Sequence, residues 1–124
     1  MDSQTKINEI VKFFFTLQML VKQYHWMTSS FARHKASDQL LEKLDDNIDK
    51  FVEVFIGRYN VKPLISSIKM DQTFLSDDGN MKLLHQARQY LESLSSDIKD
   101  SELLNIRDEI VADLNQTIYL YNLK

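Results

Sequence analysis

Side chains that can hold a metal ion recur along one stretch of the sequence. His34 and Asp38 are four residues apart, and so are Asp49 and Glu53. If this stretch is a helix, each pair lies on neighbouring turns of one face, and Asp38 and Asp49 fall within about 20° of each other around the helix axis. Each pair therefore has the spacing of two chelating ligands, and both pairs share one stripe.

The distance between the two pairs shows that one helix does not complete such a site. Asp38 and Asp49 are eleven residues apart, which is about 16 Å along a helix axis. If two copies of the helix pack antiparallel about a two-fold axis near residues 42–44, His34 and Asp38 of one copy meet Asp49 and Glu53 of the other. We therefore predict a homodimer with two equivalent shared sites.

His25 is a fifth candidate ligand, on a preceding helix. It follows Val21 by one turn on the face that we expect to be buried, and it lies between Tyr24 and Trp26. Two imidazoles and three carboxylates would suit iron and leave positions open for dioxygen or peroxide. The sequence contains no cysteine, so thiolate ligands and disulfides are excluded.

Apolar residues at intervals of three and four predict four helices. Only two glycines and one proline occur in 124 residues, which also favours an all-α protein. The segment Thr28–Ser30 supplies capping side chains and separates the first two helices. The expected helices cover residues 5–27, 31–56, 81–98 and 103–121.

Two further features define the connections. Gly57 is placed to end the second helix in a left-handed cap. Residues 58–79 contain Pro63 and several turn-forming side chains, so we predict a long connection there, with a short helix around residues 64–69. A long crossover is needed when successive helices of a bundle run parallel. Residues 1–124 are therefore expected to form a single four-helix domain.

Composition narrows the possible partners and locations. The formal net charge is −3 and no basic tail is present, so nucleic-acid binding is disfavoured. The apolar run at residues 13–21 is too short to span a bilayer, and no cleavage site follows it. We expect no membrane partner and a soluble protein of the cytoplasm, or of a host cytoplasm or virus particle.

These residues resemble a known motif. Tyr24-His25-Trp26, followed by Phe31, His34, Asp38, Asp49 and Glu53, is similar to the ferroxidase motif of the Dps branch of the ferritins, in which a His-Trp pair precedes H-x3-D-x10-D-x3-E. The turn after His25 is a few residues shorter than in that pattern.

The resemblance implies a ferritin-like four-helix bundle with a long crossover between the second and third helices. It further implies an iron-oxidising site between two subunits, with His25, His34 and Asp38 from one chain and Asp49 and Glu53 from its mate. The expected activity is oxidation of Fe(II) by dioxygen or peroxide, for detoxification or storage, in a dimer or a larger shell. Separately, the segments 30–38 and 51–55 resemble short uncharacterised proteins of phages and large DNA viruses.

Other interpretations remain open at this point. The stripe of His34, Asp38, Asp45, Asp49 and Glu53 could instead be a solvated helix face that pairs with Lys35, Lys43 and Lys50. The chain would then be a metal-free ferritin-like scaffold or assembly protein, for example in a virus particle. A DNA-protecting role is a weaker option because of the charge. We expect Trp26 to be a packing residue and His85 to be a surface or structural one.

Overall fold

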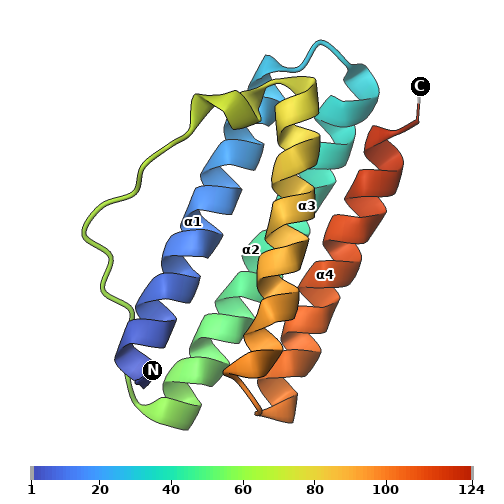
Figure 1. The fold of residues 1–124 in the computed structure, drawn as a ribbon. Helices are drawn as coiled ribbons and strands as arrows, with labels where there is room; N and C mark the ends of the chain where they lie inside the picture. The colour runs from blue at the N-terminus through green and yellow to red at the C-terminus, as the bar shows by residue number, and fades with distance from the viewer. Residues whose placement is uncertain (1, 124) are drawn as a thin grey trace.

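The chain forms a bundle of four long α-helices. The computed structural model describes residues 2–123, and no strand occurs within them. The N-terminus lies at one end of the bundle and the C-terminus at the other (Figure 1). The all-α prediction with four helices is therefore confirmed. The elements are α1 (Ser3–Met27), α2 (Phe31–Tyr59), the 3-10 helix η1 (Gln72–Leu75), α3 (Asp77–Ser93), the 3-10 helix η2 (Leu94–Ser96) and α4 (Ser101–Tyr121).

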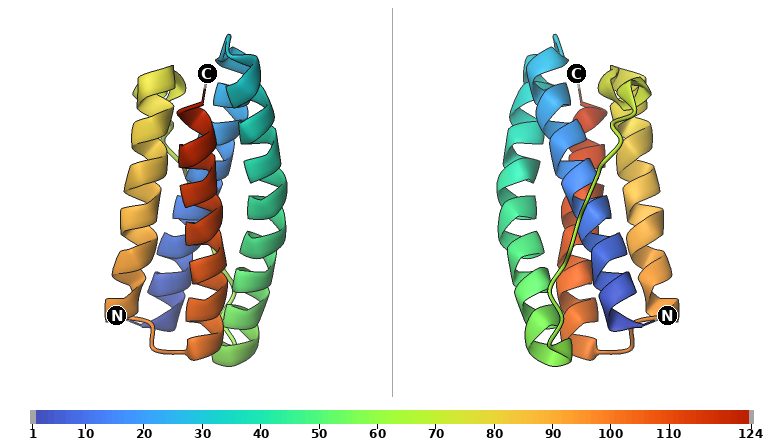
Figure 2. Two further views of the ribbon diagram at one scale, coloured as in Figure 1. Left: turned by 90° about the vertical axis from the view of Figure 1, so that its right-hand side faces the viewer. Right: turned by 90° about the vertical axis from the view of Figure 1, so that its left-hand side faces the viewer.

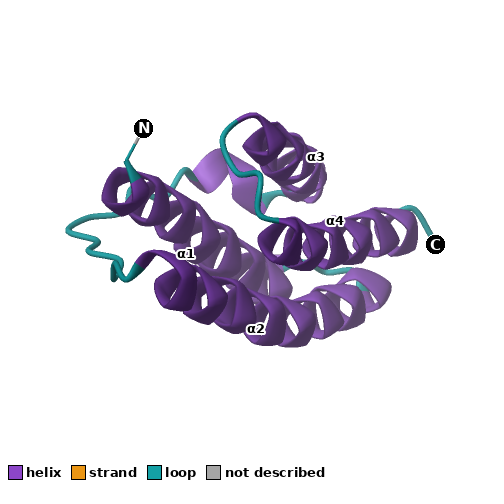
Figure 3. Ribbon diagram, turned by 90° about the horizontal axis from the view of Figure 1, so that it is seen from below, coloured by secondary structure: helices purple, strands orange, loops and turns teal. Residues whose placement is uncertain are grey.

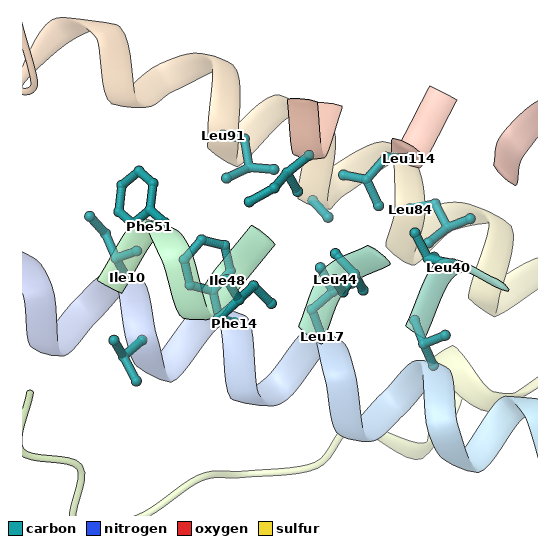
Figure 4. Packing of buried hydrophobic residues seen from close by; sticks show 14 of the residues in the cluster. Ile10, Phe14, Leu17, Leu40, Leu44, Ile48, Phe51, Leu84, Leu91 and Leu114 are labelled. Carbon is teal, nitrogen blue, oxygen red and sulfur yellow. The ribbon is translucent and has the colours of Figure 1, made fainter. Parts of the chain in front are cut away.

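The helices form because each buries one apolar stripe. Phe14 on α1 and Phe51 on α2 meet edge to face, with ring centroids 5.6 Å apart. Leucines from all four helices fill the space between them (Figure 4). Full burial of such a side chain contributes about 1.5–3 kcal/mol, so the stripe rather than helix propensity stabilises each helix.

The order of the helices in space follows from two short turns and one long connection. α1 and α2 form an antiparallel hairpin, and so do α3 and α4. α2 packs against both α1 and α4, and α3 lies beside α4 (Figure 3). The chain between α2 and α3 runs the length of the bundle along the outside of α1, so α2 and α3 point the same way (Figure 2).

The end of α2 differs from the prediction. Gly57 lies inside the helix, and Asn60 forms the left-handed cap with φ 53° and ψ 44°. The helix continues because Tyr59 packs on Phe55, with ring centroids 4.8 Å apart, and its hydroxyl donates to Asp100. These contacts favour a longer helix over one that ends at Gly57. The helix can end at Asn60 because asparagine also tolerates the left-handed conformation.

The short helix predicted around residues 64–69 is absent. The backbone N–H of Leu64 donates to the side chain of Asn8, and Gln4 donates to the carbonyl oxygen of Lys62. These bonds hold the connection in an extended form along α1, where a helix would lose them. The 3-10 helix η1 forms later, after Asp71 caps the backbone N–H of Thr73.

No helix in the described part of the chain is long and apolar enough to cross a membrane.

Candidate metal site

The α1–α2 turn brings two of the predicted ligands together. α1 ends at Met27, and Ser30 caps the start of α2 by accepting a hydrogen bond from the backbone N–H of Arg33. This tight turn places His25 and His34 against each other, at the upper end of the bundle in Figure 1. Their rings stack with centroids 3.8 Å apart and planes inclined by 16°.

Hydrogen bonds fix which ring nitrogen of each histidine is protonated. Nδ1 of His25 lies 2.7 Å from the carbonyl oxygen of His34, and Nδ1 of His34 lies 2.8 Å from the carbonyl oxygen of His25. Because a carbonyl oxygen only accepts, each Nδ1 carries the hydrogen. In the neutral rings, Nε2 then holds a lone pair. Metal-binding histidines typically have this arrangement, with the other nitrogen bonded to a backbone carbonyl or a carboxylate.

Ser37 supports the pair and was not predicted. Its side chain is fully buried. Its hydroxyl donates to the carbonyl oxygen of His34 at 3.0 Å and lies 3.0 Å from Nδ1 of His25. The signal in the sequence is a serine three residues after His34 on the buried face of α2. Ser37 therefore helps to orient both imidazoles.

The opposite side of the same turn carries a polar network that the sequence analysis also missed. The hydroxyl of Tyr24 donates to Asp77 at 2.7 Å, and Arg33 donates to the hydroxyl of Tyr24 at 3.1 Å. The hydrogen bond from Tyr24 lowers the pKa of Asp77, and burial raises the pKa of Tyr24. Arg33 also bonds the carbonyl oxygen of Tyr121 at the end of α4. The network joins the ends of all four helices and holds the turn in place.

The three predicted carboxylate ligands lie on the outside of α2. Asp38, Asp49 and Glu53 are all exposed. Asp49 borders an open groove between α1 and α2, together with Phe15 and Asp45. None of the three carboxylates makes an ion pair or a hydrogen bond to another side chain within residues 2–123.

One copy of the chain does not gather a full set of ligands. Within residues 2–123, no three His, Asp or Glu side chains come close enough together to hold a metal ion. His25 and His34 meet, but Asp38 does not complete a group of three ligands with them, and Asp49 and Glu53 lie more than four helical turns from His34 along α2. The nitrogen and oxygen donors suit iron in kind. A second copy would have to supply the missing carboxylates.

His85 and Trp26 were also considered from the sequence, and their surroundings are as follows. Nδ1 of His85 lies 3.1 Å from a guanidinium nitrogen of Arg88, which donates to it, and His85 is half-buried. Trp26 is 67% exposed, so it does not pack inside its own chain as expected. The ammonium of Lys22 lies over its ring, 5.3 Å from the centroid. Within one copy, Trp26 is therefore a surface residue next to His25.

Comparison with known proteins places the chain in a family. The family described as "Family of unknown function (DUF5856)" matches residues 25–121, which include both histidines and all three carboxylates. The chain therefore belongs to this family.

A phage protein is similar over nearly the whole length. The "Uncharacterized 14.6 kDa protein in mobD-ri intergenic region" of Enterobacteria phage T4 is 29% identical over 122 residues, which cover 97% of this chain and 91% of that protein. This agrees with the expected likeness to short phage proteins. Neither description names a metal or an activity, so the likeness to Dps stays a prediction. No solved structure matches the chain.

Proposed function

We propose that this protein binds Fe(II) at a site shared by two copies of the chain and oxidises it with dioxygen or peroxide. Iron is the substrate, and each Fe(II) gives up one electron to the oxidant. His25, His34 and Asp38 of one copy and Asp49 and Glu53 of the other are the proposed ligands. The role of the protein is to bind and orient the iron while the oxidant takes the electrons.

The stacked histidine pair is the observation that carries this proposal. His25 is buried and His34 is exposed, and both Nδ1 atoms are tied to backbone carbonyl oxygens. Each neutral ring then carries its hydrogen on Nδ1 and a lone pair on Nε2, which is the tautomer that metal-binding histidines often have. Asp38 follows His34 by one helical turn, which is a chelating spacing.

The arrangement of helices supports a ferritin-like bundle as the scaffold. Two antiparallel hairpins are joined by one connection that runs the length of the molecule, and one long crossover is typical of ferritin-like folds. The ligands of such bundles come from facing helices, whereas here α2 presents its carboxylates outward. This is why the proposed site requires a second copy.

Fe(II) oxidation under air tests the proposal directly. Fe(II) is added anaerobically to purified protein, air is admitted, and ferric absorbance is followed. We expect the wild type to oxidise Fe(II) faster than buffer alone, and Asp38→Asn and Glu53→Gln to slow it by at least about tenfold, because each removes a charged ligand. Asp46→Asn, an exposed carboxylate on the α4 side of α2, is the matched control and should keep the wild-type rate. Identical traces for all four proteins would eliminate the ferroxidase proposal.

A metal-free assembly protein is the second candidate function. The observation that favours it is the exposure of large apolar side chains, which monomeric proteins usually avoid in contiguous groups. Trp26, Met27 and Phe31, on either side of the α1–α2 turn, are 67%, 63% and 74% exposed. A protein that assembles without any effect of Fe(II) or of the Asp38 and Glu53 substitutions would fit this candidate instead.

A further inference from the structure

The turn between α1 and α2 carries three large apolar side chains that the bundle leaves in solvent. Trp26 and Met27, at the end of α1, are 67% and 63% exposed, and Phe31, which begins α2, is 74% exposed. Figure 2 shows this turn as the outermost part of its end of the bundle. The three side chains therefore lie on a projecting turn, and we call them the apolar tip.

A lysine lies one turn behind each exposed ring of the apolar tip. On α1, the ammonium of Lys22 is 5.3 Å from the centroid of the Trp26 ring. On α2, the ammonium of Lys35 is 5.6 Å from the centroid of the Phe31 ring, and both lysines are exposed. Each lysine is four residues from its ring in the direction of the bundle, which is about 6 Å along a helix axis. Both helices therefore present an apolar side chain first and a cation behind it.

The sequence around the apolar tip is basic, although the chain as a whole is acidic. Residues 10–37 contain four basic side chains and no acidic one, whereas the whole chain has 15 basic and 18 acidic side chains. Three of the four, Lys22, Arg33 and Lys35, lie within about two helical turns of the apolar tip. The tip is therefore flanked by cations on both of its helices.

Three carboxylates lie at the same end of the bundle. Asp77 of α3 accepts a hydrogen bond from the hydroxyl of Tyr24 and so belongs to the network that holds the turn. Asp78 is the next residue of α3 and is exposed. On α2, Asp38 is the first acidic residue, and it follows Phe31 by seven positions, which is about 10 Å along the axis. No acidic residue therefore stands between an exposed ring and its lysine on either α1 or α2.

We propose that the apolar tip inserts into the surface of a bilayer that contains anionic phospholipids, with Lys22 and Lys35 at the level of the lipid phosphates. Aromatic side chains favour the boundary between headgroups and acyl chains, and a lysine stem follows apolar surface while its ammonium stays with the headgroups. The offset of about 6 Å between rings and cations matches this order of layers. The contact is made by side chains at the surface of the bilayer, and it is independent of the iron site. It replaces the expectation of no membrane partner, which rested on the length of one apolar run.

Two other occupants fit the apolar tip less well. A second copy docked tip to tip would bring lysines against lysines, and like charges juxtaposed in an interface oppose association. Single-stranded nucleic acid stacks its bases on aromatic rings, but each exposed ring already has a lysine over it, and Met27 has no ring. An anionic lipid surface accommodates the apolar side chains and the cations together.

Fluorescence of Trp26 tests the proposal, because the chain contains a single tryptophan. The full chain in EDTA is titrated with vesicles of phosphatidylcholine alone or of phosphatidylcholine mixed with phosphatidylglycerol. With the mixed vesicles we expect the emission to shift to shorter wavelength, lipids brominated in the acyl chain to quench it, and the affinity to be at least about tenfold higher than with phosphatidylcholine alone. The EDTA prevents divalent cations from bridging carboxylates to lipid phosphates.

Substitutions separate the two layers of the contact. Phe31→Ser should weaken binding to the mixed vesicles by about tenfold, because it removes apolar surface, and Lys35→Gln by about fivefold, because it removes one cation. The matched controls are Leu64→Ser and Lys62→Gln. Both residues are exposed, and they lie at the opposite end of the bundle, where the start of α1 bonds their backbone. Both controls should bind as the wild type does.

Each outcome decides the proposal without reference to iron. No binding to the mixed vesicles, equal affinity for both kinds of vesicle, or binding without a shift of the Trp26 emission overturns it. A protein that sediments as a dimer with Trp26 already shifted in the absence of lipid assigns the apolar tip to a second copy, and a shift with oligothymidine but not with vesicles assigns it to nucleic acid. Either result also overturns the proposal. Weaker binding of Phe31→Ser and Lys35→Gln, with both controls unchanged, supports it.

Discussion

The polar side chains on the two edges of α2 differ in whether they have partners within the chain. On the α4 edge, Asn47 donates to Asp113 at 3.0 Å and Lys43 donates to Gln116 at 2.7 Å. At the start of the same helix, Arg33 bonds the end of α4. On the α1 edge, His34 stacks on His25 and Ser37 lies 3.0 Å from Nδ1 of His25, whereas Asp38, Asp45, Asp49 and Glu53 make no ion pair within residues 2–123.

This difference indicates which polar residues serve the fold. On the α4 edge Asn47 and Lys43 are bonded to α4, so these side chains contribute to packing the two helices together. The carboxylates on the α1 edge face solvent in one copy, where they add little to stability and repel one another. These carboxylates are therefore not needed for the fold of one copy. Four substitutions test the contrast, in order of decreasing effect.

Leu44→Ala should have the largest effect, because Leu44 lies between the two edges and is fully buried. Removing its side chain leaves a cavity among all the core helices, and we expect a loss of about 2–5 kcal/mol in the free energy of unfolding. Urea denaturation followed by circular dichroism measures it. A loss below about 1 kcal/mol would mean that α2 is not held by this core.

Arg33→Met removes the hydrogen bonds that join the start of α2 to the end of α4 and to Tyr24. The variant leaves the hydroxyl of Tyr24 and the carbonyl oxygen of Tyr121 with fewer partners, so we expect a loss of about 1–3 kcal/mol. Urea denaturation again provides the measurement. Lys35→Met, two residues further along and exposed, is the control and should change stability by less than about 0.5 kcal/mol. Equal effects for both variants would contradict the importance of the network.

Asp113→Asn should have a small effect that depends on pH. Burial raises the pKa of Asp113 in the folded protein, so the folded state favours the protonated carboxyl. The stabilising contribution is present below the unfolded pKa and is lost as pH rises through the folded pKa. Because asparagine does not ionise, the variant should gain stability relative to the wild type at about pH 7 and lose that advantage near about pH 4. Urea midpoints at the two pH values give the comparison.

Asp45→Asn, on the opposite edge of α2, is the matched control for Asp113→Asn. Its side chain is exposed and has no ion pair within residues 2–123. We expect the stability of the monomer to change by less than about 0.5 kcal/mol at either pH. A pH-dependent gain as large as that of Asp113→Asn would show that the two edges are equivalent and would remove the basis of the comparison.

The sequence was informative wherever a local pattern decides the structure. The spacing of Ile10, Phe14 and Leu17 predicts α1, and the break at residues 28–30 is where the structure has it. The stripe formed by Leu40, Leu44 and Phe51 likewise predicts α2. These features depend on periodicity and capping within a few residues, which the chain order contains directly.

The same local rules gave wrong predictions where contacts with distant parts of the chain determine the local structure. Gly57 is a good helix terminator, yet contacts of Tyr59 with Phe55 and Asp100 carry α2 to Asn60. The connection at residues 64–69 stays extended because side chains of α1 bond its backbone. Long-range bonds of this kind have no signature in the local sequence.

For the candidate site, the sequence by itself determined the ligand types and their spacing on α2, because both follow from residue identity and helix geometry. Only the tertiary structure decided that His25 and His34 stack, that their Nδ1 hydrogens are held by each other's backbone, and that Ser37 supports them. It also decided that Lys43 bonds Gln116 of α4 and that Lys35 borders a groove with Leu120 of α4. Such facts depend on which helices become neighbours, and that is a property of the packed core as a whole.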